Sequence, residues 1–137
     1  MKESNRHVAQ KVGSILLWLL TIFQALALGV AGFAKFGSAD VWIEMFTGWG
    51  YPVWFSYLIG AAEMVGAIGL LVPRFATYAA SGLFVIMVGA LATIVINVDP
   101  LGVTAPSINL IALSIIAAAR SKTRWRPAAT ATGSTSD

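Results

Sequence analysis

Cysteine is absent from the 137-residue sequence. The chain therefore has no disulfides, no thiolate metal ligands and no dithiol exchange chemistry. Histidine occurs once, as His7 in the polar amino-terminal segment, so the apolar part offers no imidazole for haem or zinc. The sequence also lacks a phosphate-binding glycine loop and a pair of carboxylates within one apolar run. Catalysis by the side chains of this chain alone consequently has no obvious machinery.

Charge is scarce as well, and apolar residues take its place. Charged residues make up 11% of the chain and hydrophobic residues 58%, which is typical of a membrane protein. Four apolar runs cover residues 12–36, 53–72, 76–98 and 106–119. About 20 residues cross the hydrocarbon layer as a helix, so three runs are long enough and the fourth is short. Because unpaired backbone amides are not tolerated in lipid, the sequence predicts an all-α fold, a four-helix transmembrane bundle.

The short connections between these runs predict one membrane domain with a tail at each end. We expect a basic cytoplasmic tail over residues 1–11, the four-span domain over residues 12–119, and a basic, then disordered, cytoplasmic tail over residues 120–137. The tripeptide ALA at residues 25–27 also fits a signal-peptide cleavage site. The apolar run continues to Phe33, beyond a typical signal core, so we interpret the whole segment as a span.

The distribution of basic residues predicts the orientation of the bundle. Eight of the nine Lys and Arg residues lie in the two tails or in the second connection, namely Lys2, Arg6, Lys11, Arg74, Arg120, Lys122, Arg124 and Arg126. Basic connections are retained on the cytoplasmic side, so both termini are expected in the cytoplasm. The net charge of +3 is then an orientation signal, which argues against nucleic acid as a partner.

One carboxylate, Glu63, interrupts the second apolar run in the segment GAAEMVGAIGLL. A rise of about 1.5 Å per residue places it roughly 15 Å deep in the membrane. Its helical face carries small residues that let helices approach closely, so Glu63 is expected to face protein: Ser56, Gly60, Gly66 and Ala67. An ionised carboxylate there costs about 2.5 kcal/mol or more unless it is neutralised, paired or hydrated. Glu63 therefore needs a partner.

The first run supplies the expected neighbours of Glu63. Gln24 and Lys35 fall on one helical stripe, and Gln24 is expected at nearly the depth of Glu63. Lys35 lies at the outer end of its span, where direct pairing with Glu63 requires tilt, water or a later start of the second span. Thr93 and Asn97 share a stripe on the third run. We expect these three faces to form one polar seam that serves as a ligand pocket.

Structural roles stay open for the same side chains. Glu63 can be protonated and hydrogen-bond to neighbouring helices without any further function. Lys35 can extend to the interface, as basic residues at helix ends usually do. Thr93, Asn97 and Asn109 can form interhelical hydrogen bonds instead of contacting a ligand.

The first connection is rich in aromatic side chains, namely Trp42, Trp49, Tyr51, Trp54 and Tyr57. Amphipathic rings favour the headgroup layer, which predicts an aromatic belt and a short interfacial helix around residues 40–46. The alternative is a lid that stacks over a ligand. The segment GWGYP breaks the helix before the second span, because it contains two glycines and a proline.

Four motifs follow one another along the chain: GFAKF at 32–36, WGYP at 49–52, IGAAEMVGAIGLLVPR at 59–74 and IMVGALAT at 86–93. Together they resemble the DoxX-like family of small four-helix integral membrane proteins. The resemblance implies a four-helix bundle in the cytoplasmic membrane, with Lys35 and Glu63 at the family's characteristic charged positions. Many members carry a histidine near the end of the third span, and residues 93–95 contain none. No proton-relay or metal role is therefore carried over.

Three functions are consistent with these observations. Family members have been linked to membrane oxidoreductase systems, so the resemblance implies an accessory or quinone-associated subunit, with a membrane or peripheral redox protein as its partner. The second function is a small proton-coupled transporter in which Glu63 titrates. The third is a structural or assembly protein without activity of its own. The sequence leaves open whether the protein is an enzyme.

Overall fold

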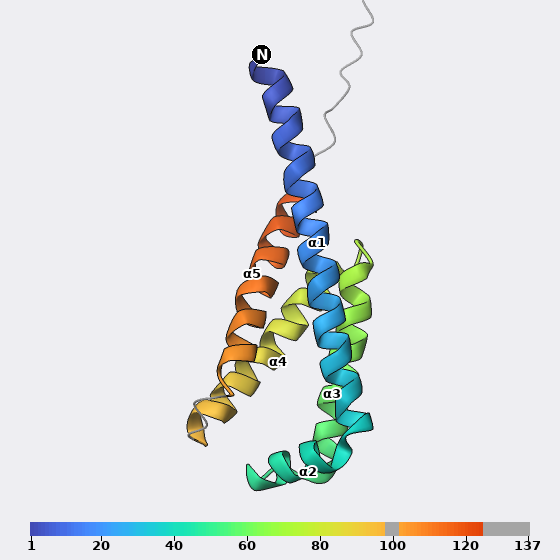
Figure 1. Ribbon diagram of the computed structural model, residues 1–137, viewed down its shortest axis with the longest axis vertical. Helices are drawn as coiled ribbons and strands as arrows, with labels where there is room; N and C mark the ends of the chain where they lie inside the picture. Colours follow the sequence, from blue (N-terminus) through green and yellow to red (C-terminus); the bar gives the residue numbers. More distant parts are fainter. Residues whose placement is uncertain (98–101, 125–137) are drawn as a thin grey trace, which may run out of the picture.

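The computed structural model describes residues 1–97 and 102–124, and five helices make up almost all of this part (Figure 1). The helices are α1 (Lys2–Gly37), α2 (Ala39–Gly48), α3 (Val53–Leu71), α4 (Ala76–Ile96) and α5 (Thr104–Arg124). Within the described residues, four helices are long and apolar enough to span a membrane, namely α1, α3, α4 and α5. The predicted all-α, four-helix bundle is confirmed, and the short helix expected around residues 40–46 is α2.

The first and last spans belong to longer helices than predicted. α1 begins at Lys2, so most of the segment expected as a basic tail is helical, and α5 continues to Arg124. No proline or glycine lies between residues 2 and 12, and a helix propagates easily once its span has formed. Pro106 stands in the first turn of α5, where its missing N–H is not needed. The tail expected to be disordered lies, over residues 125–137, outside the described part.

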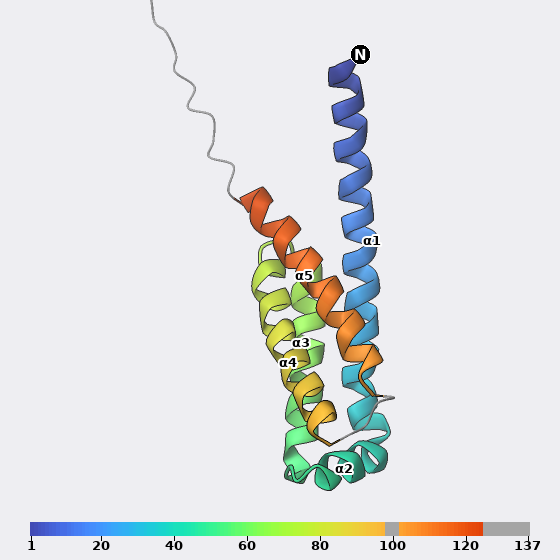
Figure 2. The same ribbon diagram turned by 90° about the vertical axis from the view of Figure 1, so that its left-hand side faces the viewer.

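α2 lies across one end of the bundle, and the amino terminus lies toward the opposite end (Figures 1 and 2). We call these the α2 end and the amino-terminal end. Phe46 on the inner face of α2 is buried, while Asp40 and Glu44 are exposed. Gly50 then adopts φ +85°, which favours glycine, and Pro52 precedes α3. The short helix thereby covers the ends of the spans.

The backbones of α1 and α3 approach closely at Gly32 and Gly60. A Cβ atom added to Gly32 would lie 2.7 Å from the carbonyl oxygen of Gly60, and one added to Gly60 would lie 2.9 Å from the carbonyl oxygen of Gly32. Small residues are what allow such packing between helices in lipid. Elsewhere in the bundle, the side chain of Leu83 on α4 packs against Gly66 on α3.

The packed core lies where the four long helices meet. Its fully buried apolar side chains include Leu28, Leu70, Leu83, Leu113 and Ile116. Toward the amino-terminal end, Arg120 of α5 lies 4.7 Å from the ring centroid of Trp18 and donates a hydrogen bond to Thr21 Oγ1 at 3.4 Å. These contacts join α5 to α1. Many large apolar side chains on the outside of the bundle are exposed, as expected where helices face lipid.

We predict that Gly60→Ala lowers the free energy of unfolding by about 1–3 kcal/mol, because the added methyl group overlaps the α1 backbone. Thermal unfolding of the purified protein in mild detergent measures the loss. Gly82→Ala on α4 is the matched control, since a Cβ at Gly82 meets open space, and it should unfold like the wild type. Equal unfolding temperatures for the two variants would contradict the close approach of α1 and α3.

Candidate functional site

A direct ion pair joins α1 to α3 inside the bundle. Nζ of Lys35 donates a hydrogen bond to Oε2 of Glu63 at 2.7 Å and another to the carbonyl oxygen of Ala31 at 3.4 Å. Lys35 and Glu63 are each only 4% exposed. The interpretation in which Lys35 extends to the interface is therefore wrong, and the pair needs no bridging water.

The level of the Gly32–Gly60 contact explains how a lysine near a helix end reaches a carboxylate in mid-helix. Lys35 lies three residues beyond Gly32 and Glu63 three residues beyond Gly60, which in antiparallel helices separates their Cα atoms by about 9 Å along the axis. Each Cα–Cβ bond leans toward the amino terminus of its own helix. The two side chains consequently lean toward one another, and the long stem of Lys35 covers the remaining distance.

Trp42 of α2 covers the ion pair. Its ring centroid lies 4.4 Å from Nζ of Lys35, within the range of a cation–π interaction. Lys35 also stands in the last turn of α1, where the helix dipole favours a positive charge. Of the two carboxylate oxygens of Glu63, only Oε2 accepts a hydrogen bond from the described residues. The other carboxylate oxygen is thus available as an acceptor.

The ion pair lines a cavity of about 340 Å³ beneath α2, which we call the polar cavity. All five helices contribute to its walls, through residues that include Leu28, Trp42, Glu63, Met87 and Asn109. Most of the wall is apolar, and its polar side-chain groups are the ion pair, the amide of Asn109 and the indole N–H groups of Trp42 and Trp49. Small-molecule sites of roughly 300–1,000 Å³ have this composition, with a few polar groups that fix the orientation of the ligand.

Asn109 of α5 gives the polar cavity its second polar point. Its Oδ1 accepts a hydrogen bond from Nε2 of Gln24 at 2.7 Å, which fixes the orientation of the amide. Among the described residues, its Nδ2 donates only to the sulfur of Met87 at 3.7 Å, and a thioether is a weak acceptor. A ligand oxygen would be a better partner, so the Asn109 amide offers the site a neutral donor in addition to the ion pair.

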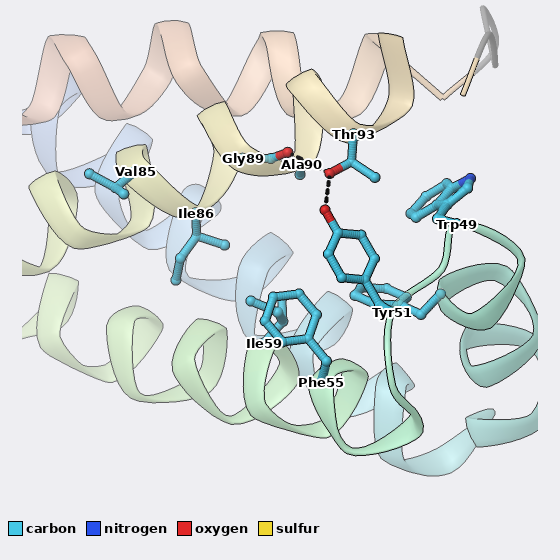
Figure 3. Close-up of a pocket in the computed structure, with 10 residues that line it drawn as sticks. Trp49, Tyr51, Phe55, Ile59, Val85, Ile86, Gly89, Ala90 and Thr93 are labelled. Atoms are coloured by element: carbon cyan, nitrogen blue, oxygen red, sulfur yellow. Dashed lines mark hydrogen bonds between the residues drawn. The ribbon is translucent and has the colours of Figure 1, made fainter. Parts of the chain in front are cut away.

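A second cavity of about 250 Å³, the apolar cavity, lies between α3 and α4 (Figure 3). The hydroxyl of Tyr51 reaches across it to Thr93 Oγ1 at 2.9 Å. Thr93 donates its single hydrogen to the carbonyl oxygen of Gly89 at 2.9 Å, so Tyr51 is the donor in the first bond. Tyr51 also stacks on Phe55, with ring centroids 4.8 Å apart. These contacts tie the connection before α3 to α4.

The structure does not bring the five residues of the expected polar seam together. Gln24 is buried, but it bonds to Asn109 and not to Glu63. Thr93 bonds to Tyr51 in the apolar cavity, and the amide of Asn97 donates to the carbonyl oxygen of Thr93 on its own helix. The physical reason is that α4 turns larger residues inward, among them Leu83 and Met87, and leaves its slim stripe outside.

The aromatic residues of the first connection divide into two groups. Trp42 and Trp49 line the polar cavity, and Trp49 and Tyr51 line the apolar cavity. Trp54 is 62% exposed on the outer side of α3, as in an aromatic belt. Tyr57 lies against Phe36 of α1, with centroids 5.6 Å apart, and so joins α3 to α1. The aromatic residues between Trp42 and Tyr57 thus form both the exposed belt and part of the cavity walls.

Sequence reasoning left Asn109 and Met87 out of the candidate site. Asn109 was expected to form an interhelical hydrogen bond, which it does, but it also lines the polar cavity. The available signal was an amide in the middle of the fourth apolar run. Met87 carried no signal, since it is an ordinary apolar residue of a span. Only the packing of α4 and α5 places both on the wall of the cavity that Glu63 lines.

The fold and site define a class: a multi-pass membrane protein, built as a four-helix bundle, with a buried ion pair facing a cavity. The chain belongs to the DoxX-like family, whose sequence pattern matches residues 19–119. Comparisons with curated proteins and with solved structures gave no match. Within residues 1–97 and 102–124, no group of three or more His, Cys, Asp or Glu side chains is placed to hold a metal ion.

We predict that Lys35→Met and Glu63→Gln each lower the free energy of unfolding by about 3–5 kcal/mol, because each leaves one buried charge without its partner. The double variant should lose clearly less than the sum of the two. A double-mutant cycle on thermal or denaturant unfolding in detergent measures this coupling. Glu44→Gln, at an exposed carboxylate on α2, is the control and should change little. Additive losses would show that the pair contributes nothing as a pair.

Proposed function

We propose that the protein binds a quinone in the polar cavity and serves as an accessory subunit of a membrane oxidoreductase system. The observation that carries this proposal is the juxtaposition of the Lys35–Glu63 ion pair and the Asn109 amide in an otherwise apolar cavity of about 340 Å³. A cavity of about 150 Å³ already holds benzene, so a substituted six-membered ring fits this space. The indole of Trp42 on the wall offers such a ring an aromatic surface.

The polar groups match both redox states of a quinone. The oxidised ring carries carbonyl oxygens, which accept hydrogen bonds, and Asn109 Nδ2 and Lys35 Nζ are donors. The reduced ring carries hydroxyl groups, which donate, and the second oxygen of Glu63 can accept. A site with donors and an acceptor around one ring therefore suits a ligand whose oxygens change from acceptors to donors.

Electron transfer in this proposal belongs to a partner. The chain has no cysteine, and its single histidine is His7. The electrons that reduce a bound quinone would come from a membrane or peripheral redox protein. The role of this chain is then to hold the ring, to keep it oriented and to exclude lipid from its oxygens.

A structural or assembly role is the second candidate, because the same ion pair joins α1 to α3 and lies under Trp42 of α2. This role predicts that Glu63→Gln weakens folding while no quinone binds to the wild type. A proton-coupled transporter has less support. Leu70, Leu83 and Leu113 are fully buried in the bundle on the amino-terminal side of the polar cavity, where a transport route would have to pass.

We further propose that the protein resides in the cytoplasmic membrane with both termini in the cytoplasm. Basic residues support this orientation at the amino-terminal end of the bundle, where Lys11, Arg74 and Lys122 belong to three different segments. At the α2 end, Asp40 and Glu44 are exposed and the only described basic side chain nearby is the buried Lys35. The α2 end then faces away from the cytoplasm.

We predict saturable binding of a short-tailed benzoquinone to the purified protein in detergent, detected as quenching of tryptophan fluorescence. Asn109→Ala should weaken binding about three- to tenfold, the loss expected for one neutral hydrogen bond. Asn97→Ala is the matched control, because among the described residues the Asn97 amide bonds only to Thr93 of α4 and does not line the polar cavity. Non-saturable quenching of the wild type would remove the basis of the proposal.

The orientation predicts opposite labelling of two engineered cysteines, which is practical because the natural chain has none. Ser38→Cys lies at the exposed end of α1 beside α2, and Ser4→Cys lies near the amino terminus. A membrane-impermeant maleimide added to intact expressing cells should label Ser38→Cys at once and Ser4→Cys only after permeabilisation. The reverse pattern would place the α2 end in the cytoplasm.

A further inference from the structure

We infer that the apolar cavity holds the hydrocarbon tail of the ligand whose ring occupies the polar cavity. This inference rests on the proposed function and narrows it, because it makes the ligand a tailed, lipid-soluble quinone and not a free ring. The tail would leave the bundle sideways, between α3 and α4, into the surrounding lipid.

The two cavities adjoin. Phe46, Trp49, Ile59 and Ala90 line both of them, so the polar cavity and the apolar cavity meet at these four residues. Phe46 belongs to α2, Trp49 follows α2 directly, Ile59 belongs to α3 and Ala90 to α4. A ring under Trp42 and a chain between α3 and α4 could therefore belong to one molecule.

The apolar cavity faces the hydrocarbon layer. Its residues on α4 run from Val85 to Thr93, which is about 12 Å along the helix axis and begins near the middle of the span. Val85 is 70% exposed and Gly89 is exposed as well, on the side of α4 that does not face the core. This side of the apolar cavity therefore opens toward the lipid around the bundle.

The chemistry of the apolar cavity suits a hydrocarbon chain and not a polar ring. Both of its hydroxyl groups already donate a hydrogen bond: Tyr51 donates to Thr93 Oγ1, and Thr93 donates to the carbonyl oxygen of Gly89 (Figure 3). No hydrogen-bond donor is left for a quinone oxygen among the lining residues that Figure 3 shows, apart from the indole of Trp49 at the margin. A volume of about 250 Å³ exceeds the roughly 150 Å³ that holds benzene, so it accepts more than six carbons.

Gly89 allows the tail site to be filled without disturbing the fold. A Cβ on Gly89 meets no atom within 4 Å, so Gly89→Leu places its side chain in or at the mouth of the apolar cavity. Gly82 lies two turns earlier on the same helix, is equally open and does not line either cavity. Gly82→Leu is therefore the matched control for added bulk on α4.

The experiment titrates wild type, Gly89→Leu and Gly82→Leu with two probes in detergent. One probe is dimethoxy-methyl-benzoquinone without a tail, and the other is the same ring with a two-isoprene tail. Affinities are compared per mole of detergent, so that partition of the tail into micelles does not count as binding. Each buried methylene raises affinity about fourfold. Wild type and Gly82→Leu should prefer the tailed probe, and Gly89→Leu should lose at least tenfold of that preference while keeping its affinity for the bare ring.

The outcomes separate this inference from the proposed function. If both probes bind wild type equally, or Gly89→Leu keeps the full preference for the tailed probe, the tail lies elsewhere and the inference fails while quinone binding stands. If Gly89→Leu loses both probes and Gly82→Leu loses neither, the two cavities do not divide ring from tail, and the inference fails again. If neither probe binds wild type, the proposed function itself fails, and the inference with it.

Discussion

The close approach of α1 and α3 is the constraint on which the rest of the structure depends. Gly32 and Gly60 let the two backbones meet, and that contact sets the level at which Lys35 and Glu63 lean toward one another. A larger residue at either glycine would move the helices apart and lengthen the 2.7 Å ion pair. A buried charge that loses its partner is strongly destabilising. The polar site is therefore a consequence of backbone packing and not only of having two charges in the chain.

The buried pair in turn explains why the chain inserts a helix between its first two spans. A lysine in the last turn of α1 would ordinarily turn outward to water or headgroups. α2 prevents this, because it lies across the bundle and places Trp42 4.4 Å from Nζ. The same covering helix supplies Phe46 to both cavities. The short helix α2 thus keeps the charge of Lys35 inside the bundle and forms one wall of the polar cavity.

The sequence predicted the helices well and the site only in part, for reasons that follow from distance along the chain. Spans, the covering helix and the inward direction of Glu63 depend on local periodicity and on small residues near it in sequence. The partner of Gln24 does not depend on local periodicity, because it is Asn109, 85 residues away in the sequence. The slim stripe of α4 failed as a guide, because Leu83 and Met87 fill the interior better than glycine does.

Two polar contacts between helices, one ion pair and one amide–amide hydrogen bond, each contribute a residue to the polar cavity. Together they indicate how the packing arrangement of the bundle is selected. The Lys35–Glu63 pair fixes α1 against α3, while the Gln24–Asn109 bond fixes α1 against α5. Apolar faces in lipid have little preference among neighbours, so such polar contacts are what select a register. The two contacts attach α1 to α3 and to α5 at two different levels of the bundle, and the polar cavity lies between these levels. The residues that α4 contributes to its wall, such as Met87 and Ile94, are all apolar. The arrangement that gives the bundle its register therefore also leaves a space with polar groups at two separate points.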